Sequence, residues 1–477
     1  MGSHMNSDTD DKVTSFLDHL RLAGYSGDAV TPSSDALLYG ELRERWSTRS
    51  EVDSPVIVAP VNETEVALVI QAARQVGLDV GVRCGGHSAQ RGAATETGVQ
   101  IHLGKLQGTR LDPESKTLRV QGGCLWDHVY KALHGSGLIA VGGGVWMVGV
   151  GGYLTGGGYS FLSAKYGMAC DQVVGARVVT GKGEIVVCDA ETNEDLFWGI
   201  RGGSSNFGIV TEFTIRLYDE PAEKSLVGVV GFSGDKLEEV LQAMKVFYTH
   251  QTDSEAIVVT YARPPPHRQP TILIMPWIQG TPEYHKKILE PFRALGPLFD
   301  GTFVAQSQTE FAHAADPFFS APGPTRHSGR GIQLNKFDFD HASALWSDWI
   351  RFSSDPKFSA SAVMFEDHHF ANLENKVGGD NAWRKRDKHM YMLLDAVYDE
   401  PEYDAVADAW IQSQVSKVDA AHKRKHGIPG GNWVIGASAA GHETPEDIWG
   451  ENLPRMRSLK KKYDPDHVFC SYFGVGI

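Results

Sequence analysis

The sequence contains little cysteine and less positive than negative charge. Its 477 residues include five cysteines, and no pair of them has the Cys-x-x-Cys spacing of a structural zinc site. Lysine and arginine number 45 against 59 aspartate and glutamate residues, so the net charge is -14. These shortages argue against a disulfide framework and against a nucleic-acid partner.

One uncharged stretch, residues 135–164, has the length of a membrane span but not its composition. Eleven of its 30 residues are glycine, and each glycine costs a helix about 1 kcal/mol relative to alanine. We therefore expect buried backbone here, no membrane partner and a soluble protein. Residues 1–4 match an expression tag, and the polar residues after them do not form a signal peptide. This favours a cytoplasmic location, although secretion stays open if a leader was trimmed.

Strand and helix signals alternate along the chain and predict an α+β protein. Two strands, at 56–60 and 79–84, flank an amphipathic helix, and such a βαβ unit normally has parallel strands. Asn62 and Glu65 have the spacing of a capping box at the start of that helix. From about residue 221, alternating apolar stretches separated by amphipathic helices predict a second domain with a mostly antiparallel sheet.

Several familiar catalytic templates do not fit this sequence. It has no P-loop, no Gly-x-Ser-x-Gly and no His-Glu-x-x-His motif. Residues 135–140 match Gly-x-Gly-x-x-Ala, but they follow a helical segment, whereas the dinucleotide fingerprint follows a strand. His368 and His369 could ligate a metal, yet no neighbour completes a site of known spacing, so no metal is expected.

Two glycine-rich segments remain as candidates for a ligand site. Residues 83–88, Arg-Cys-Gly-Gly-His-Ser, directly follow a strand, and consecutive glycines there can turn N–H groups toward a pyrophosphate. Arg83 would add positive charge, and His87 would reach the group that the phosphate carries. Residues 142–160 contain three glycine runs, which permit close approach to a planar ligand. Taken singly, each segment is better explained as structural, namely as a glycine-rich buried turn and an ordinary surface histidine.

The combination of segments is more specific. Together with EDLFWGIRGGSSNFGIVTEFTIRL at 194–217 and KKYDPDHVF at 461–469, they resemble the berberine bridge enzyme-like flavoproteins of the vanillyl-alcohol oxidase superfamily. The segments occur in the family's order along almost the whole chain. The resemblance implies a PCMH-type FAD-binding domain of two α/β subdomains at 6–220. It also implies a substrate-binding domain at 221–435, with a helix-covered antiparallel sheet, and a segment at 436–477 that returns to the FAD domain.

The resemblance implies covalently bound FAD. His87 matches the histidine that bonds to the 8α-methyl carbon of the flavin. The other residues that match the family's cofactor-binding segments are Arg83, Cys84, Gly85, Gly86, Ser88, Val145, Val148, Gly149, Gly151, Gly152, Gly156, Gly157, Gly158, Tyr159, Gly203, Phe207, Gly208 and Ile209. The protein would position this cofactor, and the flavin would carry the redox chemistry.

The departures from the family pattern refine this expectation. Family members with a doubly attached flavin have Cys-Pro-Thr-Val where this chain has Val145 to Val148, so no thiol is available and attachment through His87 alone is expected. Val148 falls at the family's dioxygen gate, where valine resembles the oxygen-using members. The sugar oxidases carry a catalytic tyrosine near the C-terminus, but residues 437–443 lack one, and His467 stands where asparagine is usual.

The substrate wall is expected to be apolar. The strand that presents glutamine or glutamate to the substrate in relatives reads Tyr-Met-Leu-Leu at 391–394. This makes oligosaccharides poor candidates and favours a hydrophobic, aromatic or polyketide-like substrate of secondary metabolism. The catalytic base is expected at Tyr391, which alternation places opposite Met392 and Leu394, then at Glu366, then at Tyr153. Each of these three side chains could instead be purely structural.

The leading hypothesis is an oxygen-dependent oxidase. A small-molecule substrate would transfer a hydride to flavin N5, and dioxygen would then reoxidise the flavin and yield hydrogen peroxide. Two alternatives stay open, namely an enzyme that couples oxidation to ring closure or rearrangement, and a flavin-binding protein without redox turnover. The sequence leaves the substrate and the oligomeric state open.

Overall fold

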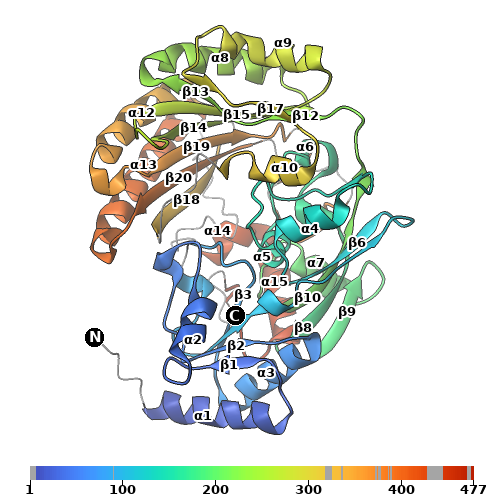
Figure 1. The fold of residues 1–477 in the computed structure, drawn as a ribbon. Coiled ribbons are helices and arrows are strands. Elements are labelled where there is room, and N and C mark those ends of the chain that lie inside the picture. Colours follow the sequence, from blue (N-terminus) through green and yellow to red (C-terminus); the bar gives the residue numbers. More distant parts are fainter. Residues whose placement is uncertain are drawn as a thin grey trace.

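The computed structural model describes most of the chain. The described residues are 7–89, 91–316, 325–334, 337–370, 373, 378–384, 386, 389–426, 444–469 and 474–476. In Figure 1 a large sheet with helices on its outer face lies above a half of the molecule that is built on two smaller sheets. None of the helices in these residues is long and apolar enough to cross a membrane.

The first small sheet contains the predicted βαβ unit. Its strands lie in the order β1 (Asp28–Val30), β2 (Val56–Ala59), β4 (Val99–His102) and β3 (Val80–Arg83). Strands β2 and β3 both run parallel to β4, while β1 is antiparallel to β2. The helices of this region are α1 (Ser7–Leu22), α2 (Ala36–Arg43) and α3 (Glu63–Val76).

The start of α3 only partly follows the predicted capping box. The Asn62 side chain accepts a hydrogen bond from the backbone N–H of Glu65, as that motif requires. The Glu65 carboxylate does not return to Asn62, because it accepts from the N–H groups of Ser26 and Val61 instead. It therefore joins the helix to the loop before β1, and its burial is balanced by these bonds.

The second small sheet is antiparallel throughout. Its order is β5 (Thr109–Asp112), β6 (Thr117–Gln121), β10 (Gly208–Arg216), β8 (Val173–Thr180) and β9 (Ile185–Asp189). The elements around it are α4 (Trp126–Leu133), β7 (Leu138–Ile139), α5 (Val150–Thr155), α6 (Ser163–Tyr166), α7 (Glu194–Ile200) and β11 (Tyr218–Asp219). Strands β7 and β11 pair with each other.

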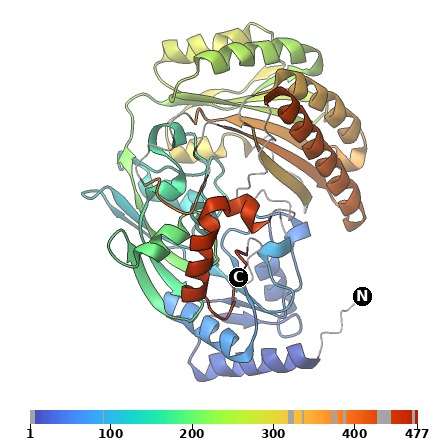
Figure 2. The ribbon, with the colours of Figure 1, turned by 180° about the vertical axis from the view of Figure 1, so that it is seen from behind.

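The last two helices pack on this half of the molecule. Figure 2 shows α14 (Pro445–Trp449) and α15 (Leu453–Tyr463) beside the two smaller sheets. Trp449 and Met456 belong to the core cluster of the antiparallel sheet. The buried ammonium of Lys460 donates to the Asp464 carboxylate at 2.6 Å and to the Asn206 carbonyl at 3.0 Å. The C-terminal helix is thereby fixed next to the start of β10.

The large sheet is also antiparallel. Its main order is β16 (Phe299–Asp300), β13 (Val230–Ser233), β15 (Thr271–Gln279), β14 (Glu255–Ala262), β19 (Ala362–Asp367), β20 (Met390–Tyr398) and β18 (Arg326–Leu334), with β12 (Ser225–Val227) between β15 and β17 (Phe303–Ala305). Its helices are α8 (Leu237–His250), α9 (Pro282–Arg293), α10 (Gln308–His313), α12 (Phe339–Ser353) and α13 (Asp404–His426). Four of these, α8, α9, α12 and α13, cover the outer face (Figure 1). The predicted α+β class, with a helix-covered antiparallel sheet, is confirmed.

Candidate functional site

A cavity of about 450 Å³ lies among residues of the two small sheets and the large sheet. The first small sheet contributes β3 and the loop after it, and the second contributes the start of β10. The glycine-rich stretch from Gly143 to Tyr159 supplies another wall. The large sheet contributes Glu366 from β19 and Tyr391 and Leu393 from β20. Segments that are far apart in the sequence thus meet at one place.

The cavity brings together most of the residues selected from the sequence. Its lining includes Arg83, Cys84, Gly85, Gly86, His87, Ser88, Val145, Val148, Gly149, Gly151, Gly152, Tyr159, Gly208 and Ile209. It also includes the three candidate bases, Tyr391, Glu366 and Tyr153. The lining does not include Gly156, Gly157, Gly158, Gly203 or Phe207. Residues 437–443, where the family's tyrosine is missing, lie outside the described residues.

Some glycines of the motif provide room for protein rather than for a ligand. Gly157 has a φ of +108°, and a Cβ there would lie 2.6 Å from the indole nitrogen of Trp383. A Cβ on Gly85 would lie 2.6 Å from the backbone nitrogen of Gly149, so these two segments pack directly against each other. At Gly152 a Cβ would meet no atom within 4 Å. Gly152 therefore exposes backbone to the cavity.

Two arginines, the buried Arg45 and the partly buried Arg83, bring positive charge to the cavity. Arg45 and Arg83 both line it, and burial together with the nearby Arg83 lowers the pKa of Arg45 to about 10. Arg83 donates to the Leu42 carbonyl at 2.9 Å, but its buried Nε has no hydrogen-bond partner among the described residues. A pair of arginines with a free donor favours an anionic ligand. The donor set therefore fits the pyrophosphate of FAD.

His87 presents an uncharged imidazole to the cavity. Burial and the neighbouring His327 lower the pKa of His87 to about 4, so at neutral pH a ring nitrogen keeps its lone pair. The Cys84 thiol is the other nucleophile of this loop, but burial raises its pKa. Its Sγ–H points to the Cys124 carbonyl at 3.5 Å. Of the two side chains, His87 is the better nucleophile at neutral pH.

The roof of the cavity is built on β19 and β20, and β18 lies beside β20. Glu366 on β19 and Gln333 on β18 are the register partners of Tyr391 on β20. Met392 and Leu394 belong to the core under the helices, so the predicted alternation of β20 agrees with the structure. The Glu366 carboxylate lies 3.0 Å from Nε2 of His368. His368, a possible metal ligand by its sequence alone, thus contacts a carboxylate of this roof.

Tyr159 belongs to a second polar cluster under the same sheet. Its hydroxyl lies 2.6 Å from Nε2 of His389, and the Gln333 amide donates to that hydroxyl. The Tyr159 ring centroid is 5.0 Å from that of Phe370 and 5.7 Å from that of Tyr391. The aromatic rings pack together, and the hydrogen bond between the Tyr159 hydroxyl and Nε2 of His389 shares one proton. The cluster can hold or move a proton next to the cavity.

Tyr153 is less suited to proton transfer than its position suggests. Its ring packs edge-on against Trp126, with centroids 5.2 Å apart. Its hydroxyl is buried and has no hydrogen-bond partner among the described residues. Burial raises the pKa of Tyr153 well above its usual range, so its proton is held tightly.

Sequence reasoning missed Arg45, Gln333, His389 and a further residue, Trp46, which stacks on His87. Trp46 and Arg45 precede the glycine loop by about 40 positions and carry no motif. Gln333 and His389 reach Tyr159 only through the pairing of β18 with β20. A correct prediction of the register between β18 and β20 would have been needed to identify Gln333 and His389.

A cavity with two arginines, an uncharged histidine on a glycine loop and a roof of Tyr391, Leu393 and Glu366 fits a flavin-dependent oxidoreductase. The comparisons with known proteins agree. The family of FAD binding domains matches residues 54–189, and the family described as berberine and berberine like matches residues 428–475. The chain thus matches both families, and relatives along nearly its whole length are FAD-linked oxidoreductases, so the resemblance seen in its motifs is confirmed.

Individual relatives match over nearly their whole length. The chain is 27% identical to the FAD-linked oxidoreductase pgmH of Aspergillus terreus, over 92% of this chain and 91% of that protein. It resembles the structure of 6-hydroxy-D-nicotine oxidase from Arthrobacter nicotinovorans with a TM-score of 0.81 and 24% identity, over 94% and 98% of the two chains. For BBE-like 1 of Physcomitrella patens the TM-score is 0.82 and the identity 18%, over 97% and 99%. The predicted PCMH-type fold is confirmed.

Proposed function

We propose that this protein is an oxygen-dependent FAD oxidase of a hydrophobic small molecule, with FAD attached through His87 alone. The observation that carries this proposal is the composition of one cavity. It joins the arginine pair and the neutral His87 to a roof of Tyr391, Leu393 and Glu366. The bound FAD would accept a hydride from the substrate and pass the two electrons to dioxygen.

The attachment through a single residue rests on the properties of three side chains. His87 is uncharged at neutral pH because burial lowers its pKa, so it can act as a nucleophile toward the cofactor. Val145 stands where doubly attached relatives have a cysteine, and it is 41% exposed, so an alkyl group rather than a thiol faces outward there. Cys84 is held in its thiol form by burial. These properties support one covalent bond.

The wall of the cavity supports an apolar substrate. Leu393, Tyr391 and Tyr159 face it from the roof and the side, and they would exclude water from the reacting C–H bond. Two pairs, Glu366 with His368 and Tyr159 with His389, are placed to accept a proton. Such pairs favour a catalyst over a flavin-binding protein without turnover. Aromatic secondary metabolites are the substrate class that fits this wall.

Two measurements test the proposal. Acid-precipitated protein should retain its yellow colour, and peptide mass mapping should place one flavin on the peptide that contains His87. Flavin released by acid, or found on Cys84, would overturn the single attachment. A panel of aromatic alcohols, phenols and cyclic amines should contain compounds that bleach the flavin without oxygen and yield one peroxide per turnover in air. If a compound bleaches the flavin but yields no peroxide in air, the proposal that this protein is an oxidase is wrong.

A further inference from the structure

The indole of Trp46 lies between two histidine rings. It stacks on His87 with centroids 4.5 Å apart and planes 11° apart. It also stacks on His327, at 3.7 Å and 27°. The backbone N–H of Trp46 donates to the carbonyl of Gly86 at 3.1 Å. Trp46 is thus bound to both the backbone and the ring of the loop that carries His87.

His327 is fixed on several sides. Its Nδ1 lies 3.0 Å from the Asp395 carboxylate, which can only accept, so that nitrogen carries a proton. Its Nε2 lies 3.0 Å from the Thr325 hydroxyl. Its backbone N–H donates to the hydroxyl of Ser47, also at 3.0 Å. The ring against the far face of Trp46 therefore has little freedom to rotate.

The segment around Trp46 is anchored to the large sheet and its helices. The N–H of Thr48 donates to the Thr325 carbonyl at 2.9 Å, just before β18. Both terminal nitrogens of Arg49 donate to the Asp408 carboxylate on α13, at 2.6 and 2.8 Å. Residues 46–49 therefore connect the loop of His87 to the half of the molecule that roofs the cavity.

We infer that Trp46, held by His327, is a positioning residue that sets the ring plane of His87 for covalent attachment to FAD. The inference rests on the proposed linkage at His87. In that linkage a C–N bond forms between a ring nitrogen of His87 and the 8α carbon of FAD. One C–H and one N–H bond break, and the two electrons and two protons pass to the flavin and then to dioxygen, which becomes hydrogen peroxide.

The geometry explains why a positioning residue matters at this place. A free histidine ring rotates about χ2, and only a narrow range of orientations aims a nitrogen at one carbon atom. The stacked face of Trp46, which is itself backed by the ring of His327, limits this rotation without forming a bond to either nitrogen of His87. The Trp46 ring is 37% exposed, so its removal would leave an open surface rather than a buried cavity.

The test compares the rate of attachment with the strength of FAD binding. Apoprotein of the full chain is mixed with FAD, samples are denatured in acid, and flavin fluorescence on the chain is followed with time. Trp46→Ala and His327→Ala should slow attachment by on the order of tenfold to hundredfold. Trp46→Phe, which keeps a stacked ring, should restore most of the rate. Noncovalent FAD binding, measured by flavin fluorescence quenching in native protein, should stay within about twofold.

A control variant separates positioning from general damage. Trp410 stacks on Phe352 at 4.2 Å and 6°, among the helices of the large sheet, and does not contact the cavity loop. Trp410→Ala should attach FAD at the parental rate. Parental attachment in Trp46→Ala would overturn the inference, and so would a loss of FAD binding equal to the loss of attachment. If the parent itself attaches no FAD, the linkage at His87 is wrong, and this role falls with it.

Discussion

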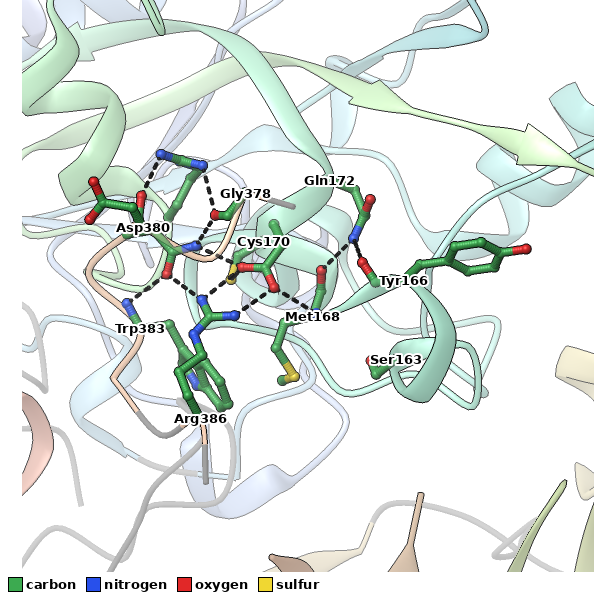
Figure 3. A network of polar contacts seen from close by, with 12 residues as sticks. Ser163, Tyr166, Met168, Cys170, Gln172, Gly378, Asp380, Trp383 and Arg386 are labelled. Atoms are coloured by element: carbon green, nitrogen blue, oxygen red, sulfur yellow. Dashed lines mark hydrogen bonds and ion pairs between the residues drawn. The ribbon is translucent and has the colours of Figure 1, made fainter. Parts of the chain in front are cut away.

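Asp171 and Arg386 form a two-bond ion pair in the interior, with nitrogen–oxygen distances of 2.6 and 2.8 Å. The Asp171 side chain is fully buried, and the Asn381 amide donates to the same carboxylate at 2.7 Å. Arg201 donates to two backbone carbonyls of the segment 378–386. Figure 3 shows Arg386 and Trp383 beside Cys170 and Met168. A segment between β19 and β20 is thereby fixed to the wall that contains Tyr159.

Removing the cation of this pair should destabilise the protein strongly. Arg386→Met leaves the carboxylate of Asp171 buried with fewer donors, and we expect a loss of about 3–5 kcal/mol in the free energy of unfolding. The measurement is urea unfolding followed by tryptophan fluorescence. Arg351→Met is the matched control, because Arg351 pairs with Asp348 while its own side chain is 76% exposed, and its loss should stay below about 1 kcal/mol. Equal losses of unfolding free energy in the two variants would show that the burial of the Asp171–Arg386 pair does not make it more important than an exposed pair.

The pattern of apolar residues predicted the α+β class, because individual helices and strands have their own local signals, whereas the PCMH-type fold was predicted from the resemblance. Asn62 caps α3, Gly77 ends it in the left-handed conformation, and β20 alternates between the core and the cavity. A helix or strand that buries one face needs apolar residues at a regular spacing, and this spacing is visible in the sequence. The order of strands in the large sheet has no comparable local signal.

The candidate site was predictable where a motif or the alternation of a strand marks it, as for Tyr391 on β20. The loop at 83–88 and the stretch around Gly149 carry motifs, and both line the cavity. Glycine density was misleading at Gly157, because a glycine is needed there to admit the indole of Trp383. Contacts such as that of Trp46 with His87 arise between distant segments. A single sequence does not encode them in any spacing.

Val148 offers a test of oxygen access that needs no substrate. It lines the cavity, and its carbonyl accepts the N–H of Trp126 at 3.1 Å, so a larger side chain acts on a fixed backbone. Val148→Leu should slow reoxidation of photoreduced enzyme in air about tenfold, which corresponds to about 1.4 kcal/mol. Stopped-flow absorbance measures this rate. Val145→Leu, in the same wall, is the control and should reoxidise as the parent does; equal slowing in both would show that position 148 is no gate.

His102 should make the fold sensitive to mild acid. Its Nδ1 accepts the N–H of Gly104 at 2.9 Å, and burial followed by repulsion from Arg83 lowers its pKa to about 4. In the unfolded chain the imidazole gains a proton below about pH 6.5. Stability is therefore lost as the pH falls from about 6.5 toward 4, by up to about 3 kcal/mol.

The variant His102→Asn removes this titration and keeps an acceptor for Gly104. We expect its free energy of unfolding to fall less than that of the parent between pH 7 and pH 4.5. Urea unfolding at both pH values gives the difference. Parallel losses in the two proteins would mean that the protonation of His102 does not govern the acid sensitivity.

The last prediction concerns the group that removes the substrate proton. Tyr391 and Glu366 are register partners in the roof, and both line the cavity. Tyr391 directs its hydroxyl toward Gly331 on β18, whereas Glu366 keeps a carboxylate 22% exposed and paired with His368. A carboxylate with a second group to share the proton is the better acceptor. Glu366→Gln should therefore slow flavin reduction by about 10²–10⁴-fold, and Tyr391→Phe should slow it less.

The measurement is anaerobic single turnover with the first compound of the panel that bleaches the flavin, followed as a function of pH. Substrate binding, taken from the concentration dependence, should change little in Glu366→Gln, because a base acts in the transition state. His368→Gln is the companion variant, and it should shift the pH profile more than the maximal rate. If Glu366→Gln and Tyr391→Phe both reduce as fast as the parent, neither residue is the base. The pair of Tyr159 and His389 is then the remaining acceptor in the described wall, and Tyr159→Phe would test it in the same assay.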